Sequence, residues 1–276
     1  MTYCVGIEVN EGLVFAADTR TSASFDDVRV YRKMHVFEWP GERVFAIMSA
    51  GNLANTQLTL SRLQRDIDNP GAGRSLRTFS HLYEVAEYVG DTLVASQVKV
   101  SDEDQHNGVS VQSTLILGGQ IAGERPGLYL VYPLGNCIAT SPETPYLQIG
   151  ESKYGKPILD RILRPEIPLE DAARCALVSL DSTIRSNLSV GMPIDMVLLR
   201  AGELKVTQKM RLDRDTPLYA EIHDTWSRKL ESAMASLPRF PWEPARDPEE
   251  APSALPVMPP RRITPRLDPG DPQSQQ

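Results

Sequence analysis

The chain has 276 residues, enough for one large domain or two small ones, and its 41% hydrophobic and 24% charged residues are typical of a globular protein. Its formal net charge is −7, from 29 Lys and Arg against 36 Asp and Glu, which argues against a dedicated nucleic-acid binder. No apolar run approaches the roughly 20 residues that cross a bilayer, so we expect no membrane partner.

The cellular location is predicted from the cysteines and from the first residues. Cys4, Cys137 and Cys175 lie far apart, which fits a reducing compartment and leaves no zinc-binding spacing. The N-terminus lacks the basic and apolar regions of a signal peptide. We therefore expect a cytoplasmic protein.

The first fifty residues predict two strand pairs. Residues 2–9 and 13–17 are apolar strands on either side of a tight turn at 10–12. A hairpin with that turn pairs residue i with about residue 21 minus i. After a polar loop, residues 33–38 and 43–49 predict the second pair.

The rest of the chain alternates between runs of helices and runs of strands. Helices are predicted from apolar periodicity at 53–68, 80–97, 156–163 and 169–184. Strands bounded by Gly and Pro are predicted at 109–117, 127–132, 138–139, 194–200 and 204–210. This order predicts an α+β fold in which paired antiparallel sheets are covered by helices. Of the 22 prolines, 11 lie in residues 238–276, which predicts a disordered tail.

Thr2 is the first candidate for chemistry. Methionine aminopeptidases remove Met1 when the second residue is small, so we expect the mature chain to begin with Thr2. That residue would then carry a hydroxyl nucleophile beside an α-amine base, whose unperturbed pKa is about 7.7–8.0. Chains that begin Met-Thr are common, so the residue alone does not define a site.

Two charged residues are predicted to lie beside Thr2. The hairpin register brings Asp18 close to the start of the first strand, and Lys33 begins the third. A Lys33 ammonium group there would lower the pKa of the Thr2 α-ammonium group, and Asp18 would keep Lys33 charged. Taken singly, Asp18 is equally a turn carboxylate and Lys33 a solvated charge at a strand end.

Gly51 is a further candidate because it lies at a strand-to-helix junction. Its N–H group could face a developing oxyanion, although the backbone conformation of such a turn can also require a glycine. The four histidines are scattered and do not favour a Ser-His-Asp triad. The sequence contains no phosphate-binding glycine motif, and we predict no metal and no cofactor.

The pattern as a whole resembles that of proteasome β-type subunits, which are N-terminal-nucleophile hydrolases. The shared features are an N-terminal Thr, Asp-x-Arg-x-Ser/Thr, a later Lys, and Ala-Gly before a long helix. Residues 1–6, 12–21, 49–54, 148–161 and 185–191 resemble a bacterial proteasome-related subgroup called Anbu. The resemblance covers about residues 2–237 and implies a four-layer αββα hydrolase domain over 1–237, followed by the tail at 238–276.

The resemblance also implies a role for particular residues. Thr2 would attack a peptide carbonyl, Asp18 and Lys33 would tune its base, and the Gly51 N–H group would stabilise the oxyanion. Ser189 matches a serine that lies beside the nucleophile in the family. The substrate would bind as an added strand along backbone groups. The residues expected to contact it are Thr21, Tyr31, His35, Ser49 and the backbone of Gly51.

Two positions depart from the family. Ser186 stands where an Asp is common, and Glu151 replaces the serine of a Gly-Ser-Gly stretch, unless Ser152 takes its place. These departures leave the nucleophile in place and favour a weak or highly selective hydrolase. The resemblance implies a homo-oligomeric ring or spiral that takes peptide or unfolded-protein substrates, with a possible unfoldase partner. A small-molecule amidase and an assembly-forming scaffold without turnover remain the alternatives.

Overall fold

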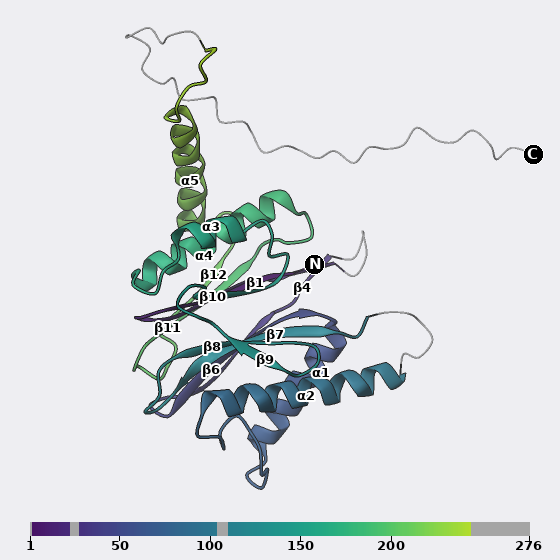
Figure 1. Ribbon diagram of the computed structural model, residues 1–276. Helices are drawn as coiled ribbons and strands as arrows, with labels where there is room; N and C mark the ends of the chain where they lie inside the picture. Colours follow the sequence, from purple (N-terminus) through teal and green to yellow (C-terminus); the bar gives the residue numbers. More distant parts are fainter. Residues whose placement is uncertain (1, 23–27, 104–109, 244–276) are drawn as a thin grey trace, which may run out of the picture. The chain divides into compact units, whose positions relative to one another are not determined.

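The computed structural model describes residues 2–22, 28–103 and 110–243. The chain divides into two compact parts, Met1–His223 and Asp224–Gln276. The first part contains all of the strands. Two five-stranded antiparallel sheets form its centre, and helices cover the outer face of each (Figure 1).

The first sheet contains the N-terminal hairpin and has the strand order β10-β1-β2-β11-β12. Its strands are β1 (Tyr3–Val9), β2 (Gly12–Asp18), β10 (Tyr146–Gly150), β11 (Ile194–Arg200) and β12 (Gln208–Leu212). In the hairpin, Cys4 pairs with Ala17 and Val9 with Gly12. This register is the one predicted from the turn, so the approach of Asp18 to the start of β1 follows from the sequence.

The second sheet has the order β5-β6-β7-β8-β9. Its strands are β5 (Met34–Trp39), β6 (Arg43–Gly51), β7 (Ser113–Ile121), β8 (Gly127–Val131) and β9 (Cys137–Ala139). A separate two-stranded sheet consists of β3 (Arg20–Ser22) and β4 (Val28–Val30). It connects the end of β2 to the residues that precede β5.

Helices complete the four layers. The second sheet is covered by α1 (Leu53–Asp68) and α2 (Leu82–Glu103), and the first by α3 (Lys156–Ile162) and α4 (Leu169–Ser186). The Asn52 side chain caps α1 by accepting a hydrogen bond from the Asn55 N–H group at 3.0 Å. Pro157 is the second residue of α3 and Pro168 is the N-cap of α4, positions at which a missing N–H group is tolerated.

Three apolar cores lie between these layers. One fills the space between α3, α4 and the first sheet, the second lies between the two sheets, and the third packs α1 and α2 onto the second sheet. Successive residues of β1 alternate between the first two cores: Tyr3 belongs to the helix-facing core and Cys4 to the core between the sheets. Thus the start of β1 is anchored on both faces.

The expected α+β sandwich of two antiparallel, helix-covered sheets is confirmed, whereas several elements were not predicted. The strands β3, β4 and β10 and the helix α5 (Pro217–Ala235) are additional. β10 is an edge strand of only five residues and α5 buries only Tyr219, so neither gives a long apolar pattern. The last strand begins at Gln208, not at residue 204, because a longer turn with Leu204 at a φ of 49° precedes it.

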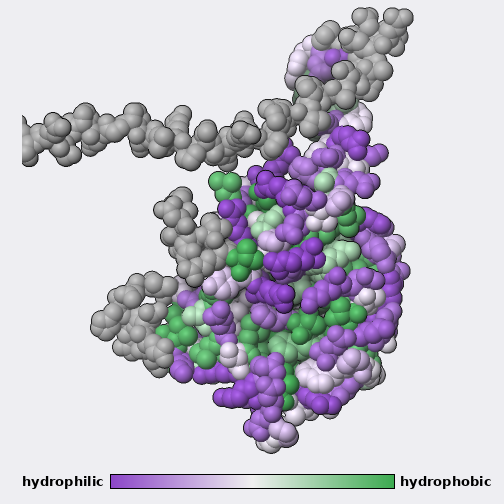
Figure 2. Space-filling model, turned by 180° about the vertical axis from the view of Figure 1, so that it is seen from behind, coloured by the Kyte–Doolittle hydropathy of each residue, from purple (hydrophilic) through white to green (hydrophobic). Residues whose placement is uncertain are grey.

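The predicted tail at 238–276 extends beyond the described residues, which end at residue 243. Over the parts of the chain that the structure describes, no helix is long and apolar enough to span a membrane. On the face seen in Figure 2, apolar side chains form small patches separated by polar ones. This distribution agrees with the location of the large apolar residues in the three cores.

Candidate active site

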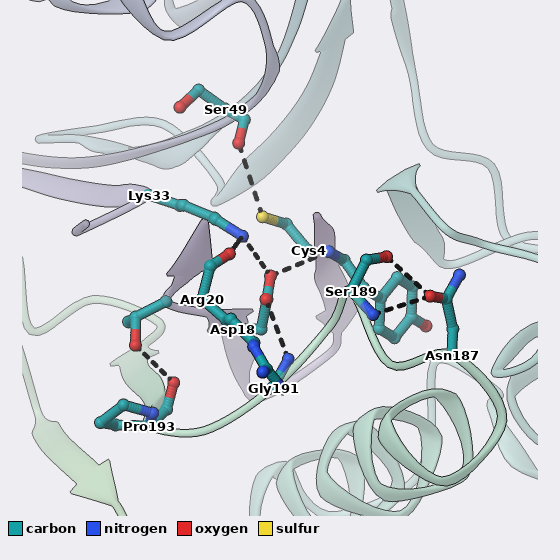
Figure 3. A network of polar contacts seen from close by, with 11 residues as sticks. Cys4, Asp18, Arg20, Lys33, Ser49, Asn187, Ser189, Gly191 and Pro193 are labelled. Carbon is teal, nitrogen blue, oxygen red and sulfur yellow. Dashed lines mark hydrogen bonds and ion pairs between the residues drawn. The ribbon is translucent and has the colours of Figure 1, made fainter. Parts of the chain in front are cut away.

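The site is centred on the carboxylate of Asp18, which ends β2 and is completely buried. Its Oδ1 atom accepts hydrogen bonds from the Tyr3 N–H group at 2.9 Å and from Lys33 Nζ at 2.7 Å. Its Oδ2 atom accepts one from the Gly191 N–H group at 3.2 Å. Figure 3 shows Lys33 and Gly191 reaching this carboxylate from different elements. Three distant segments of the chain therefore meet at one side chain.

Lys33 lies just before β5 and is only 6% exposed. Besides its ion pair with Asp18, its ammonium group donates to the Arg20 carbonyl oxygen at 2.6 Å. Its own carbonyl oxygen accepts from the Ser49 N–H group at 3.0 Å. Backbone contacts on both sides thus fix the direction of this lysine, so its charge is held next to Asp18.

Burial governs the electrostatics of this pair. It raises the pKa of the Asp18 carboxyl group, and Lys33 together with the Tyr3 and Gly191 N–H groups offsets part of that increase. Transfer of two charges out of water is unfavourable unless both are well paired and hydrogen bonded. A buried pair of this kind is more often associated with function than an exposed one.

Thr2 immediately precedes β1 and is held through its backbone. Its carbonyl oxygen accepts a hydrogen bond from the Glu151 N–H group at 2.7 Å, and the next N–H group, that of Tyr3, is bonded to Asp18. Side chains alternate along an extended chain, so Thr2 faces the same side as Cys4. The Cys4 thiol lies 3.8 Å from the Ser49 carbonyl oxygen, in the layer that also contains Lys33.

Cys4 is not a nucleophile in this structure. Its thiol is fully buried, and burial raises its pKa far above that of a free thiol. Because the thiolate is the reactive form, a thiol that retains its proton is inert. Of Thr2 and Cys4, which share this face, the Thr2 hydroxyl group is the one available for chemistry.

Gly51 ends β6 and has a φ of +114°, a conformation that favours glycine. A Cβ atom at this position would lie 2.4 Å from the Gln112 carbonyl oxygen. Both the backbone conformation and the available space therefore require a glycine here. Within the described residues, no hydrogen bond joins Gly51 to Asp18 or Lys33.

Ser189 belongs to the loop between α4 and β11, which also supplies Gly191. Its hydroxyl group donates to Asn187 Oδ1 at 2.6 Å, and its N–H group donates to the same oxygen at 3.0 Å. Asn187 was not singled out in the sequence, and it determines where the Ser189 hydroxyl group points. Figure 3 shows this pair beside the Asp18 cluster.

The residues expected to contact a substrate lie in different elements of the structure. Thr21 pairs with Arg29 within the small β3-β4 sheet, and the Tyr31 N–H group donates to the Thr19 carbonyl oxygen at 2.9 Å. Ser49 is buried behind Lys33. Of the four, only His35 lines the groove described next.

That groove has a volume of about 650 Å³ and runs between the edge strands β5 and β12, with α1 along one side. Basic side chains gather in it, whereas it contains one carboxylate, Asp195, which pairs with Arg211 at 3.2 Å. Burial lowers the pKa of His35; a hydrogen bond with the Arg32 backbone offsets part of this effect, and the charge of Arg32 adds to it. Tyr31 and Ser49 are not among its lining residues.

Two glycines next to the site were not assigned a role from the sequence. A Cβ atom at Gly150 would lie 1.8 Å from the Thr2 carbonyl oxygen, and one at Gly191 would lie 2.7 Å from Arg20 Cδ. Both occur in stretches that resemble the Anbu subgroup, which was the available signal. No cluster of three or more His, Cys, Asp or Glu side chains suited to a metal occurs among the residues that the structure describes.

The sandwich and the buried Asp18–Lys33 pair at the start of β1 define a proteasome-type N-terminal-nucleophile fold. The proteasome subunit family model matches residues 2–199, so the chain belongs to that family. Proteasome subunit beta 2 of Pyrobaculum calidifontis is 25% identical over 202 residues, which cover 71% of this chain and 87% of that protein.

Solved structures place the chain more closely, in the Anbu group. Anbu from Yersinia bercovieri is 42% identical with a TM-score of 0.81, covering 86% of this chain and 99% of that one. A structure described as the helical assembly of the Anbu complex from Pseudomonas aeruginosa is also 42% identical, with a TM-score of 0.82. It covers 87% of this chain and 98% of the other.

Proposed function

We propose that this protein is a threonine-dependent amide hydrolase that cleaves peptides, with Thr2 as the nucleophile. The observation that carries the proposal is the shared Asp18 Oδ1 atom, which accepts from both the Tyr3 N–H group and the Lys33 ammonium group. Tyr3, which follows Thr2 in the chain, and the buried Lys33 ammonium group are therefore bonded to the same oxygen atom. Exposing the Thr2 amine requires removal of whatever precedes it, which is Met1 in this sequence.

The reaction would proceed in two halves. The Thr2 hydroxyl oxygen attacks the substrate carbonyl carbon, and its proton passes to the Thr2 α-amine, directly or through water. The ammonium group formed then protonates the departing amine as the C–N bond breaks, which leaves an ester on Thr2. Water attacks that ester with the amine again as base, releasing the acid and restoring the hydroxyl group.

Electrostatics supports this assignment of the base. A positive charge at Lys33 disfavours a second positive charge nearby, which lowers the pKa of the Thr2 α-ammonium group. Asp18 holds Lys33 in place, and its oxygens also accept hydrogen bonds from the Tyr3 and Gly191 N–H groups. We propose that the Gly51 N–H group binds the oxyanion, a contribution of about 3 kcal/mol for one donor.

We further propose that the protein works as a homo-oligomer in the cytoplasm. Support comes from the assembly described for the Anbu complex of Pseudomonas aeruginosa. Enclosure within an assembly would restrict a broad amide hydrolase to peptides and unfolded chains. Sedimentation of the purified protein tests this part directly, and a monomer at micromolar concentration would contradict it.

The test of the chemistry compares the native chain with Thr2→Ala and Thr2→Ser, using a fluorescent peptide that carries an electrophilic epoxyketone. The native chain should begin with Thr2 by mass spectrometry and become labelled there. Thr2→Ala should lose at least about 99% of the labelling rate, while Thr2→Ser, which keeps a hydroxyl group, should retain part of it. Equal labelling of Thr2→Ala would exclude Thr2. Absence of all labelling and hydrolysis would favour a scaffold.

A further inference from the structure

The segment Gln148–Gly155 passes unusually close to the first residues of β1. Gly150 has a φ of +84°, and a Cβ atom there would fall 1.8 Å from the Thr2 carbonyl oxygen. The next N–H group, from Glu151, donates to that same oxygen at 2.7 Å. A residue with a side chain at position 150 would push Thr2 away, so this glycine permits the contact that holds the Thr2 backbone.

A buried polar network lies on the opposite face of β1. The Tyr3 hydroxyl group lies 2.5 Å from Ser179 Oγ, and it accepts a hydrogen bond from Gln148 Nε2 at 2.5 Å. Gln148 also donates to the Ser152 carbonyl oxygen at 3.2 Å. Tyr3 and Ser179 are completely buried. We call Tyr3, Gln148 and Ser179 the Tyr3 network; it joins β1, β10 and α4.

Gly155 provides the space for this network. A Cβ atom at Gly155 would lie 2.0 Å from Ser179 Oγ and 2.5 Å from the Tyr3 hydroxyl oxygen. Gly155 belongs to the Tyr-Gly-Lys-Pro stretch of the sequence, which resembles the Anbu subgroup and has no role in the chemistry described above. The structure thus gives that stretch a physical purpose: it accommodates the hydroxyl group of the residue next to Thr2.

The role of the network is geometric. Burial raises the pKa of Tyr3 to about 12, so its hydroxyl group keeps its proton at neutral pH. The network therefore carries no charge toward the site. The network is linked to Thr2 through the peptide bond between Thr2 and Tyr3. Tyr3 itself is held by its side chain on one face and by the hydrogen bond from its N–H group to Asp18.

We propose that the Tyr3 network is a positioning device that sets the place of Thr2 relative to the Asp18–Lys33 pair. This proposal rests on the function proposed above. Thr2 is a chain end once Met1 is removed, and chain ends fray unless they are tied down. Displacement of a reacting group by about 1 Å can lower a rate by about 100-fold. Fixing Tyr3 at three points removes that freedom.

The experiment compares the full-length native chain with Tyr3→Phe, Ser179→Ala and Tyr146→Phe. Tyr146→Phe is the matched control: it also removes the hydroxyl group of a buried tyrosine in the first sheet, but this half-buried hydroxyl group bonds to Lys156 at 2.8 Å and to Asp160. Labelling by the peptide epoxyketone gives a maximal rate and a half-saturating concentration for each. Tyr3→Phe should lower the maximal rate at least tenfold and Ser179→Ala about threefold, with half-saturation unchanged within about twofold.

Tyr146→Phe should label like the native chain. A native maximal rate in Tyr3→Phe, or an equal loss in Tyr3→Phe and Tyr146→Phe, would overturn the positioning proposal while leaving Thr2 as the nucleophile. If the native chain itself is not labelled, the proposed function fails. In that case hydrogen exchange decides the positioning question: amides of residues 3–9 should exchange faster in Tyr3→Phe than in Tyr146→Phe, and equal rates would refute it.

Discussion

The β1–β2 hairpin has a carboxylate–cation pair at each of its ends, and the two pairs differ in their surroundings. At the open end, Asp18 and Lys33 are 2.7 Å apart, with side-chain exposures of 0% and 7%. At the turn, Glu11 and Arg200 are 3.3 Å apart, with exposures of 47% and 38%. Arg200 also pairs with Glu170, another exposed residue.

The difference shows that the energetic contribution of an ion pair depends on its burial. An exposed pair contributes about 0–1 kcal/mol, because water solvates both charges almost as well as they solvate each other. A buried pair stabilises little overall, but removal of one partner leaves a charge with no solvent and is strongly unfavourable. A fold keeps such a pair when it serves another purpose, and here that purpose is the proposed chemistry.

The largest effect is expected from Lys33→Met, which keeps the length of the side chain and removes its charge. The free energy of unfolding at pH 7 should fall by about 3 kcal/mol, because the Asp18 carboxylate is left buried without its cation. Peptide hydrolysis should also be lost. Arg200→Met at the turn is the control and should change stability by less than about 1 kcal/mol in urea unfolding. Equal losses of stability in Lys33→Met and Arg200→Met would contradict the difference between the buried and the exposed pair.

The pH dependence of that loss sharpens the comparison. Burial already raises the pKa of Asp18, and without Lys33 the offsetting interaction is gone. A carboxyl group whose pKa is raised by folding is most favourable below its unfolded pKa and loses that advantage as the pH rises through the folded value. The stability gap between Lys33→Met and the native chain should therefore narrow as pH falls from 7 to 4. A constant gap in urea unfolding at each pH would contradict this origin.

A smaller effect is expected at the two glycines that flank β6. Gly51→Ala meets both an unfavourable φ and the Gln112 carbonyl oxygen 2.4 Å away, so we expect a loss of about 2 kcal/mol. Gly41→Ala, in the turn before β6, has a φ of +79° and no atom within 4 Å of the added Cβ. It should lose about 1 kcal/mol, the cost of the left-handed conformation alone. Thermal unfolding of both variants measures the two losses, and a larger loss in Gly41→Ala than in Gly51→Ala would contradict this prediction.

The smallest effect is expected from Glu11→Gln. The amide oxygen can still accept the hydrogen bond that the Leu169 N–H group donates to Glu11 at 3.0 Å. Only the exposed interaction with Arg200 is lost, so stability should change by less than about 1 kcal/mol and the labelling rate of Thr2 should not change. A large loss of labelling would show that the two ends of the hairpin are coupled.

The sequence predicted those parts of the fold that have a local cause. The turn at 10–12 set the hairpin register, and this register alone brought Asp18 to the start of β1. The sandwich followed from the order of strand and helix patterns. β10 and α5 were missed because a strand of five residues is too short, and a helix with one buried residue too polar, to give a clear apolar pattern. The position of β10 depends on its pairing with β1, which is not local.

The candidate site was predicted to a similar extent. Asp18, Lys33 and Gly51 could be singled out because charge and glycine at strand ends are visible in a sequence. Gly150 and Gly191 could not, since their importance is the distance to a backbone atom on another strand or to a distant side chain. The bond from Ser189 to Asn187 is a matter of loop geometry, which the sequence leaves open.

The burial of Cys4 has a practical consequence for distinguishing classes of inhibitor. Cys4, Cys137 and Cys175 are unpaired, and burial raises the pKa of each thiol. Alkylating agents such as iodoacetamide, applied briefly to the folded protein, should therefore leave hydrolysis intact. Sensitivity to such reagents is the usual sign of a cysteine protease, and its absence would separate this protein from that class before any mutagenesis is done.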